Sequence, residues 1–243
     1  MGNERYIAFL DILGFSDLIL NTDLKEILKK FELILFLIPY AEVLGEWTNF
    51  GERVHTGNKK CSCFSFSDTF VLCSRDATPE SLNTIIIATF ILSRNLFALG
   101  FPVRGAITKG EADYIPNTDH LIGKAIIEAA RLEKQQNWFG VILSPEVLSI
   151  GTKNDTLCKS AAQILTEYSV PLKNGENIPH LVINWRLNLV VKYGTKSLLP
   201  KPFDTQSKTK INNTLKFAKY LRDTKQAYKK LNEKWQQNFG SSL

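Results

Sequence analysis

The chain has 243 residues, of which 44% are hydrophobic and 22% charged, as is usual for a globular protein with a sizeable core. Its formal net charge of +6 suits an anionic ligand such as a nucleotide, but it is not the charge of a dedicated nucleic-acid-binding protein. The N-terminus lacks the pattern of a signal peptide, and the longest apolar run, residues 33–40, is too short to span a bilayer. The four cysteines lack the spacing of a zinc site, so we expect reduced core thiols and a cytoplasmic protein without a stable membrane partner.

Strand-like apolar runs alternate with long helical periodicities. The first half predicts a strand at 6–10, a helix at 23–47 that Pro39 kinks or interrupts, a strand–turn–strand unit at 61–73 and a helix at 79–99. The second half predicts a strand at 101–108, a helix at 121–137, a strand at 141–143, a hairpin at 168–185 and a basic helix at 205–238. This alternation favours an α/β or α+β fold with helices packed on one sheet. We divide the chain into a domain at 1–186 and an extension at 187–243.

Two aspartates stand at the ends of predicted strands. Asp11 ends the first strand, and Asp68 lies at the bend of the 61–73 unit, between two apolar runs. Carboxylates at adjacent strand ends can converge on divalent cations, and Mg²⁺ completes its shell with water and phosphate oxygens. Gly14 follows Asp11 closely and lets backbone N–H groups turn toward an anion. Each feature taken alone also fits a turn or a capping residue.

Four segments, taken together, resemble the class III nucleotide cyclases. FLDILGFSDL resembles the opening motif of that family, and FSFSDTFVL resembles its second metal motif, a hairpin centred on Gly-Asp. PVRGAITKG resembles the Arg-x-Gly-Ile-x-x-Gly strand, and LIGKAIIEAARLE resembles the helix that reads Gly-x-x-Val-Asn-x-Ala-x-Arg-x-Glu. The resemblance covers residues 6–145 and implies the α+β class III cyclase-like fold. That fold has a ferredoxin-like βαββαβ core, followed here by a helical C-terminal extension.

The resemblance implies a role for each matched position. Asp11 and Asp68 would hold two divalent cations, Mg²⁺ or Mn²⁺, with help from the backbone carbonyl of Ile12. Arg131 would stabilise charge at the transferred phosphorus and would come from the second subunit of a homodimer with composite active sites. The phosphate-binding residues would be Gly14, Phe15, Ser16, Arg104 and Lys173. Two-metal chemistry would then join the ribose 3′-hydroxyl to the α-phosphate and release pyrophosphate.

The chain departs from the purine cyclases where those read the base and the ribose. Phe64 and His120 stand at the positions of the lysine and the acidic residue that read adenine, and Ile127 replaces the asparagine that contacts the ribose. The chain is more similar to the bacterial pyrimidine cyclases of the Pycsar anti-phage systems. Those proteins open with a strand such as YIAFLDILGFS, carry a Ser-Asp hairpin and continue through a VPLK…INW segment, here residues 170–185.

This second resemblance implies that the protein makes cyclic UMP from UTP, or cyclic CMP from CTP, in response to infection. The cyclic nucleotide would activate a separate effector protein. Phe64, Ser65 and His120 are the candidates for reading the base. We favour UTP on prevalence within the family, and no residue decides between the two substrates.

Two other functions stay open. The lysines of the basic helix, interleaved with aromatic residues, fit either a nucleic-acid-binding module or the solvated face of a docked helix, and we favour the docked helix. The missing base readers also fit a catalytically inactive cyclase fold that serves for dimerisation or ligand binding.

Overall fold

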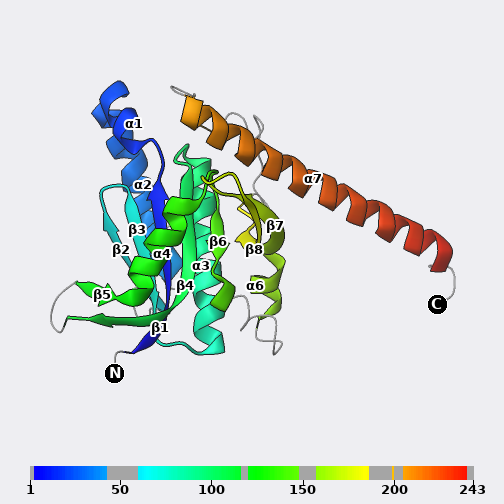
Figure 1. Ribbon diagram of the computed structural model, residues 1–243, viewed down its shortest axis with the longest axis horizontal. Coiled ribbons are helices and arrows are strands. Elements are labelled where there is room, and N and C mark those ends of the chain that lie inside the picture. The colour runs from blue at the N-terminus through cyan, green and yellow to red at the C-terminus, as the bar shows by residue number, and fades with distance from the viewer. Residues whose placement is uncertain are drawn as a thin grey trace.

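A sheet of eight strands forms the centre of the described part of the chain (Figure 1). The computed structural model describes residues 3–42, 60–115, 120–147, 157–185, 199 and 205–239. The strands are β1 (Glu4–Ile12), β2 (Cys61–Phe66), β3 (Thr69–Ser74), β4 (Val103–Tyr114), β5 (Leu121–Gly123), β6 (Val141–Leu143), β7 (Leu165–Pro171) and β8 (Asn177–Ile183). Their order is β2–β3–β1–β4–β6–β8–β7, and β5 pairs with β4. β1 therefore lies inside the sheet, antiparallel to both β3 and β4.

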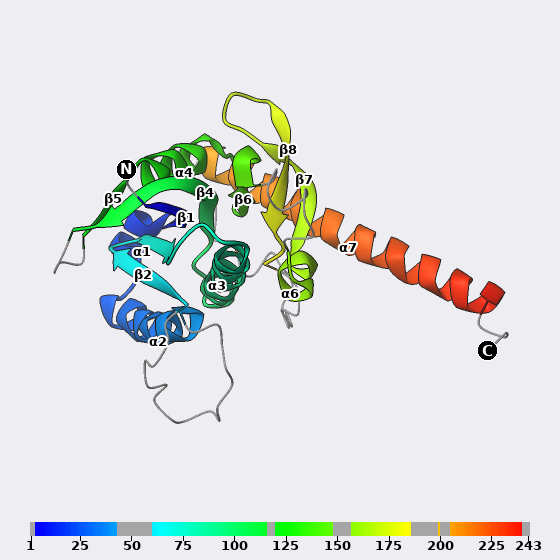
Figure 2. The ribbon, with the colours of Figure 1, turned by 90° about the horizontal axis from the view of Figure 1, so that it is seen from below.

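Helices cover both faces of this sheet. They are α1 (Phe15–Asn21), α2 (Leu24–Glu42), α3 (Pro79–Ala98), α4 (Lys124–Gln135), α6 (Lys159–Gln163) and α7 (Thr205–Phe239). α2 and α3 pack on one face, and α4 packs on the other face over β1 and β4 (Figure 2). The result is the α+β fold expected from the sequence, with a mixed sheet because β4 and β6 are parallel.

Side chains on the two faces of β1 pack into two different apolar clusters. Tyr6, Ala8 and Leu10 point to the larger core with α3, and none of them is more than 1% exposed. Ile7 points the other way and packs with Ala125 of α4 and its neighbours. Since successive side chains of a strand alternate between faces, Asp11 lies on the α4 side. The strand thus brings a carboxylate to the edge of the smaller cluster.

α3 is the helix among those described that is long and apolar enough to cross a membrane. Its most apolar window is 61% buried within the protein, and Leu82, Ile85 and Leu92 are fully buried in the main core. Thr78 caps its first turn by accepting a hydrogen bond from the backbone N–H of Ser81. These contacts are those of a core helix.

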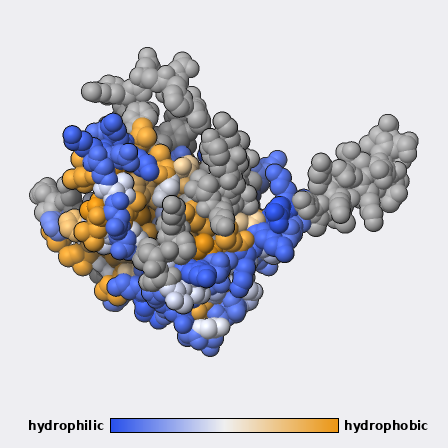
Figure 3. Space-filling view, turned by 90° about the horizontal axis from the view of Figure 1, so that it is seen from above, coloured by the Kyte–Doolittle hydropathy of each residue, from blue (hydrophilic) through white to orange (hydrophobic). Residues whose placement is uncertain are grey.

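The first half of α7 is part of the packed body. Phe217 is fully buried, with its ring centroid 4.9 Å from that of Trp138 and 4.8 Å from that of Tyr168. The Thr214 hydroxyl accepts a 2.8 Å hydrogen bond from the backbone N–H of Phe139. The helix then runs away from the body (Figures 1 and 2), and its described part is mostly hydrophilic, whereas hydrophobic residues reach the surface of the body in Figure 3. Docking of this helix, predicted from its apolar positions, is confirmed for its first half.

Most of the predicted elements are confirmed. The short helices α1 and α6 were not predicted, and two predicted helices differ from the structure. The predicted helix at 121–137 begins as strand β5, because Leu121–Gly123 pairs with the end of β4, and α4 starts only at Lys124. α2 continues past Pro39 to Glu42, so this proline does not interrupt it, and the predicted end at residue 47 lies outside the described residues.

Candidate active site

The two aspartates singled out by the sequence lie next to each other. Asp11 is near the end of β1, and Asp68 occupies the turn between β2 and β3, where Ser67 has a positive φ of 55°. The backbone N–H of Ile12 donates a 2.9 Å hydrogen bond to the carbonyl of Asp68. Asp11 also faces Thr69 in the register of β1 and β3, and the Thr69 hydroxyl donates to Asp11 Oδ1 at 3.4 Å. The hairpin bend is thereby tied to the end of β1.

Negative charge accumulates around Asp11. Burial, the carboxylate of Glu133 and the carboxylate of Asp68, in that order, raise the pKa of Asp11 to about 6. The guanidinium of Arg104 and the hydrogen bond from Thr69 oppose this rise. A partly buried carboxyl beside two others is unfavourable in its charged form unless a cation joins it. This environment is the one that a bound divalent cation would relieve.

The donors at this place fit Mg²⁺ or Mn²⁺. Asp11 and Asp68 supply carboxylate oxygens, and Ile12, whose N–H bonds the Asp68 carbonyl, lies between them. Among the described residues, no group of three or more His, Cys, Asp or Glu side chains could hold a metal ion. Mg²⁺ is commonly held by one or two carboxylates together with water and substrate phosphates, so two carboxylates suffice when a triphosphate is the substrate. The predicted cation-binding set stays a prediction that this geometry supports.

The segment after Asp11 forms the expected turn. Gly14 adopts a left-handed conformation with φ 76° and precedes the first residue of α1. No side chain caps α1, so its first N–H groups are available to an anion. Phe15 turns its ring inward, 5.4 Å from the ring of Phe31, while Ser16 is exposed. Gly14 and Ser16 can therefore meet phosphate through the backbone or a hydroxyl, whereas Phe15 can do so only through its N–H.

Arg104 stands directly opposite Asp11 on the neighbouring strand β4, on the same face of the sheet. It is only 4% exposed, and each of its three guanidinium nitrogens has a partner. Nε and Nη2 contact Glu133 Oε1, and Nη1 donates a 3.0 Å hydrogen bond to the Gln136 carbonyl. An arginine has five N–H groups, so a direct contact between Arg104 and a phosphate, as the sequence predicted, would have to use the N–H groups that these three contacts leave over.

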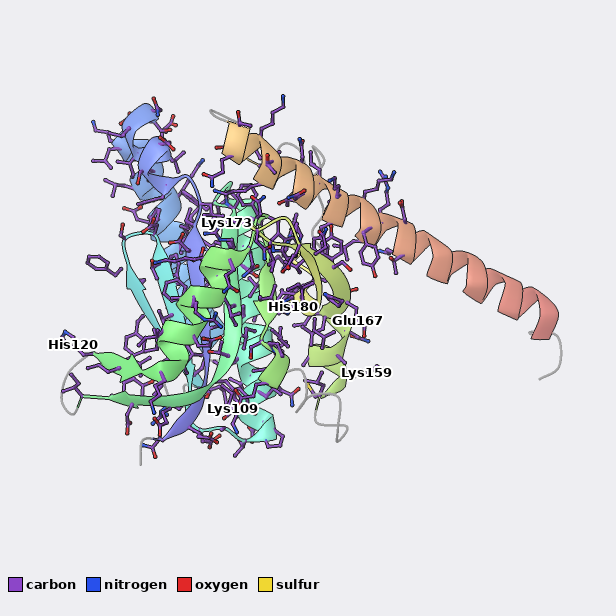
Figure 4. All side chains as sticks on the ribbon, in the orientation of Figure 1. Lys109, His120, Lys159, Glu167, Lys173 and His180 are labelled. Atoms are coloured by element: carbon purple, nitrogen blue, oxygen red, sulfur yellow. The ribbon has the colours of Figure 1, made fainter. Side chains whose placement is uncertain are left out.

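Lys173 lies at the β7–β8 hairpin, which the backbone joins to the end of α4. Its N–H donates a 2.8 Å hydrogen bond to the Gln135 carbonyl, and Leu172 forms a bridge with Gln136. Burial, followed by the nearby positive charge of Arg104, lowers the pKa of Lys173, while Glu133 raises it. Figure 4 shows Lys173 at one end of the body. The structure thus brings this lysine to the Arg104–Glu133 pair, close to the aspartates.

Arg131 lies apart from the aspartates of its own chain. It is exposed on α4 and forms an ion pair with Glu128 at 2.7 Å. Because successive helical residues are turned by about 100°, Arg131 points about 200° away from Glu133, which faces Arg104. Arg131 can therefore serve an active site only if that site belongs to a second copy of the chain.

The three base-reading candidates lie at different places in the structure. Phe64 shares the face of Asp11, through the pairing of Phe64 with Val71 beside Phe9, and its ring centroid is 5.8 Å from that of Tyr114. Ser65 belongs to the opposite face, because side chains alternate along β2.

His120 lies beyond the far end of β4, where its carbonyl accepts a hydrogen bond from Ile115. Ten positions of β4 separate Arg104 from Tyr114. The strand bends over this length, because the Tyr114 ring reaches Phe64 on β2. Figure 4 shows His120 at the left side of the body and Lys173 toward its top. His120 thus belongs to the β4–β5 end of the sheet, whereas Asp11 faces the beginning of β4.

Glu133 is the residue at this site to which the sequence analysis gave no role. It is 2% exposed and belongs to the buried stripe of α4 with Ala125, Ala129 and Leu132. A carboxylate on the apolar stripe of a helix is a signal that the sequence did contain, because buried charges are nearly always paired. Its partner, Arg104, could not be identified without the packing of α4 on β4.

The comparisons with known proteins establish the fold. No protein-family model and no curated protein matches the chain. One similar solved structure is the catalytic core of a rhodopsin-guanylyl cyclase with converted specificity, in complex with ATPαS. It has a TM-score of 0.52 and 11% identity, over 75% of this chain and 95% of that chain. Another is a class III adenylyl cyclase-like ATP-binding protein from Pseudomonas aeruginosa, with a TM-score of 0.39 and 14% identity, over 67% of this chain and 36% of that chain.

The first of these similarities shows that the chain has the fold of the class III nucleotide cyclases, as its motifs predicted. At such low identity it shows the fold alone. The reaction that a protein of this fold catalyses depends on the residues of its own site.

Proposed function

We propose that the protein is a nucleotide cyclase that converts UTP to 3′,5′-cyclic UMP and pyrophosphate. The observation that carries this proposal is the Asp11–Asp68 pair, held at adjacent strand ends on a class III cyclase-like fold. The negative surroundings that raise the pKa of Asp11 favour divalent cations at this place.

Each residue of the site has a task that its position supports. Asp11, Asp68 and the carbonyl of Ile12 would hold two Mg²⁺ or Mn²⁺ ions. When bound, these ions supply Lewis acidity toward the ribose 3′-hydroxyl and the α-phosphate. The N–H groups of Gly14, Phe15 and Ser16 and the ammonium of Lys173 bind the triphosphate, with the charge of Arg104 behind them. These groups hold the nucleotide so that the 3′-oxygen and the leaving pyrophosphate lie in line with phosphorus.

A second copy of the chain completes the site by supplying Arg131. Several large apolar side chains support such an interface, because they are exposed on β2, β5 and α4: Phe66 is 85%, Ile122 is 63% and Ile127 is 72% exposed. Large apolar side chains that are exposed to this extent are candidates for a protein–protein contact. His120 follows the far end of β4, and we propose that it reads a base across this interface.

The base and the biological role rest on the similarity to the pyrimidine cyclases of anti-phage defence. We propose UTP as the substrate, CTP as the alternative, and a separate effector that responds to the product in the cytoplasm. Phe64, on the face of Asp11, offers a ring for a base to stack on. Uracil and cytosine differ by a carbonyl acceptor against an amino donor, so one mispaired group would discriminate between them by a few kcal/mol.

Product analysis tests the activity. Purified protein is incubated with each of the four NTPs and Mn²⁺, and the products are identified by mass spectrometry. We expect cyclic UMP from UTP and no product from the Asp68→Ala variant, which should still be a folded dimer. A folded dimer that forms no cyclic nucleotide from any NTP would establish the alternative, an inactive cyclase fold.

Mixing two inactive variants tests the composite site. Asp68→Ala and Arg131→Ala should each be inactive alone, since each removes one half of every site. When subunits exchange, a mixed dimer has one intact site, so up to about a quarter of the activity should return, as statistics of random pairing require. Absence of recovery, despite exchange shown by labelled subunits, would contradict a site shared between copies.

A further inference from the structure

A buried ion pair lies directly beside the metal-binding carboxylates. Arg104 and Glu133 are 4% and 2% exposed, and each is the other's charged partner. Breaking such a buried pair is strongly unfavourable, because the remaining charge is left without compensation. Arg104 is therefore held where Glu133 places it.

This restraint matters because Arg104 lies beside Asp11, with which it could otherwise pair. Arg104 and Asp11 are directly opposed in the antiparallel pairing of β4 with β1, on one face of the sheet. Side chains opposed in this way have Cβ atoms about 5 Å apart, close enough for an arginine to pair with a carboxylate. The guanidinium instead turns to α4, where Glu133 and the Gln136 carbonyl take up all three of its nitrogens.

The support for this arrangement extends through the end of α4. The Gln136 side chain donates to the Gly105 carbonyl at 2.9 Å and accepts from the Trp138 indole at 2.8 Å. The same turn of chain binds Lys173 through the Gln135 carbonyl at 2.8 Å. Buried polar networks in which the members are satisfied are rigid, so the acceptors of Arg104 stay fixed.

We propose that Glu133 is a positioning residue that keeps Arg104 from pairing with Asp11, so that Asp11 stays free to bind the catalytic cations. This inference rests on the proposed function, since it concerns the same site. Without the Glu133 charge, the nearest carboxylates for Arg104 are those of the metal site. Arg104 would then compete with the cations for Asp11, and metal binding would weaken.

Metal binding without any nucleotide tests the proposal. Mn²⁺ titrations, followed by the electron paramagnetic resonance signal of free Mn²⁺, are done on the full chain and on Glu133→Gln. We expect the Kd for Mn²⁺ to rise at least tenfold in Glu133→Gln. In activity assays the loss should be recovered at high Mn²⁺. Glu111→Gln is the matched control, because it removes one negative charge from an exposed ion pair with Lys124, and it should bind Mn²⁺ as the parent does.

The double variant Arg104→Met/Glu133→Gln separates positioning from a merely structural role. It removes the competing cation together with its restraint, so Mn²⁺ affinity should return to within about threefold of the parent. It also leaves no charge unpaired in the core, so it serves where Glu133→Gln alone does not fold. Weak binding by the folded double variant, or tight binding by folded Glu133→Gln, would overturn the proposal. The Mn²⁺ affinities of both variants are measured without cyclisation. Failure of the proposed function would therefore appear separately, as tight Mn²⁺ binding without a cyclic product.

Discussion

Replacing Asp11 with asparagine should stabilise the metal-free protein at neutral pH. The pKa of Asp11 is about 6 in the folded protein, against 3.8 for an ordinary aspartate, because of burial and the carboxylates of Glu133 and Asp68. The folded state therefore holds a proton on Asp11 more tightly than the unfolded state does. Under this linkage, stability falls as pH rises from about 4 to about 6, and the penalty is complete above pH 6.

The size of the effect follows from the difference between the two pKa values. Each pKa unit corresponds to about 1.4 kcal/mol, which gives a ceiling of about 3 kcal/mol above pH 6. Asp11 is partly exposed, so solvent screening reduces the expected gain of Asp11→Asn to about 1–2 kcal/mol. Asparagine keeps the shape of the side chain and can still accept the hydrogen bond from Thr69.

Urea unfolding in EDTA at pH 4.5 and pH 7.5 measures this gain. The free energy of unfolding of Asp11→Asn should exceed that of the parent at pH 7.5, and this difference should shrink at pH 4.5. Asp223→Asn, at an exposed site on α7, is the control and should change stability by less than about 0.5 kcal/mol at both pH values. Saturating Mn²⁺ should make the parent more stable than Asp11→Asn, since Mn²⁺ stabilises only the protein that binds it, here the parent. A metal-free Asp11→Asn variant that is less stable than the parent at pH 7.5 would refute the electrostatic account of this site.

Four further predictions concern the rest of the molecule. Lys173→Gln should raise KM for the nucleotide about tenfold or more by steady-state kinetics while leaving Mn²⁺ affinity unchanged, because a charge-assisted contact to phosphate is lost. Gly14→Ala should cost about 1–2 kcal/mol in urea unfolding, because a Cβ is strained at φ 76°. Phe217→Ala should cost about 3–5 kcal/mol in the same assay, since its ring is fully buried between Trp138 and Tyr168. The protein should not retard DNA or RNA at physiological salt, and strong binding with a steep salt dependence would restore the nucleic-acid hypothesis for α7.

The sequence predicted the elements that carry the proposed metal site because local chemistry specifies them. An apolar strand that ends at Asp11 and a polar Ser67–Asp68 bend between apolar runs are short-range patterns, and the hairpin register follows from the bend. β5 was missed for the converse reason. Its three residues become a strand only through pairing with the end of β4, which is a tertiary contact.

The burial of Arg104 and its ion pair with Glu133 could not be predicted from its motif. The motif predicted a cation near the phosphates, and the register places Arg104 opposite Asp11. Its burial depends on α4 packing over β4, a contact between segments about thirty residues apart. Sequence patterns identify which charges are present at a site, whereas packing decides which of them are already paired.

The same reasoning underlies the proposal that the site is split between two copies. Lys173 lies near Arg104, which faces Asp11. His120 follows the other end of β4, and Arg131 is exposed on α4. We therefore propose that a second copy, rather than the same chain, presents Arg131 and His120 to the nucleotide. If His120 does touch the base, His120→Ala must behave like Arg131→Ala and complement Asp68→Ala in mixed dimers. If it instead complements Arg131→Ala, His120 acts on the aspartate side, and the arrangement of copies proposed here is wrong.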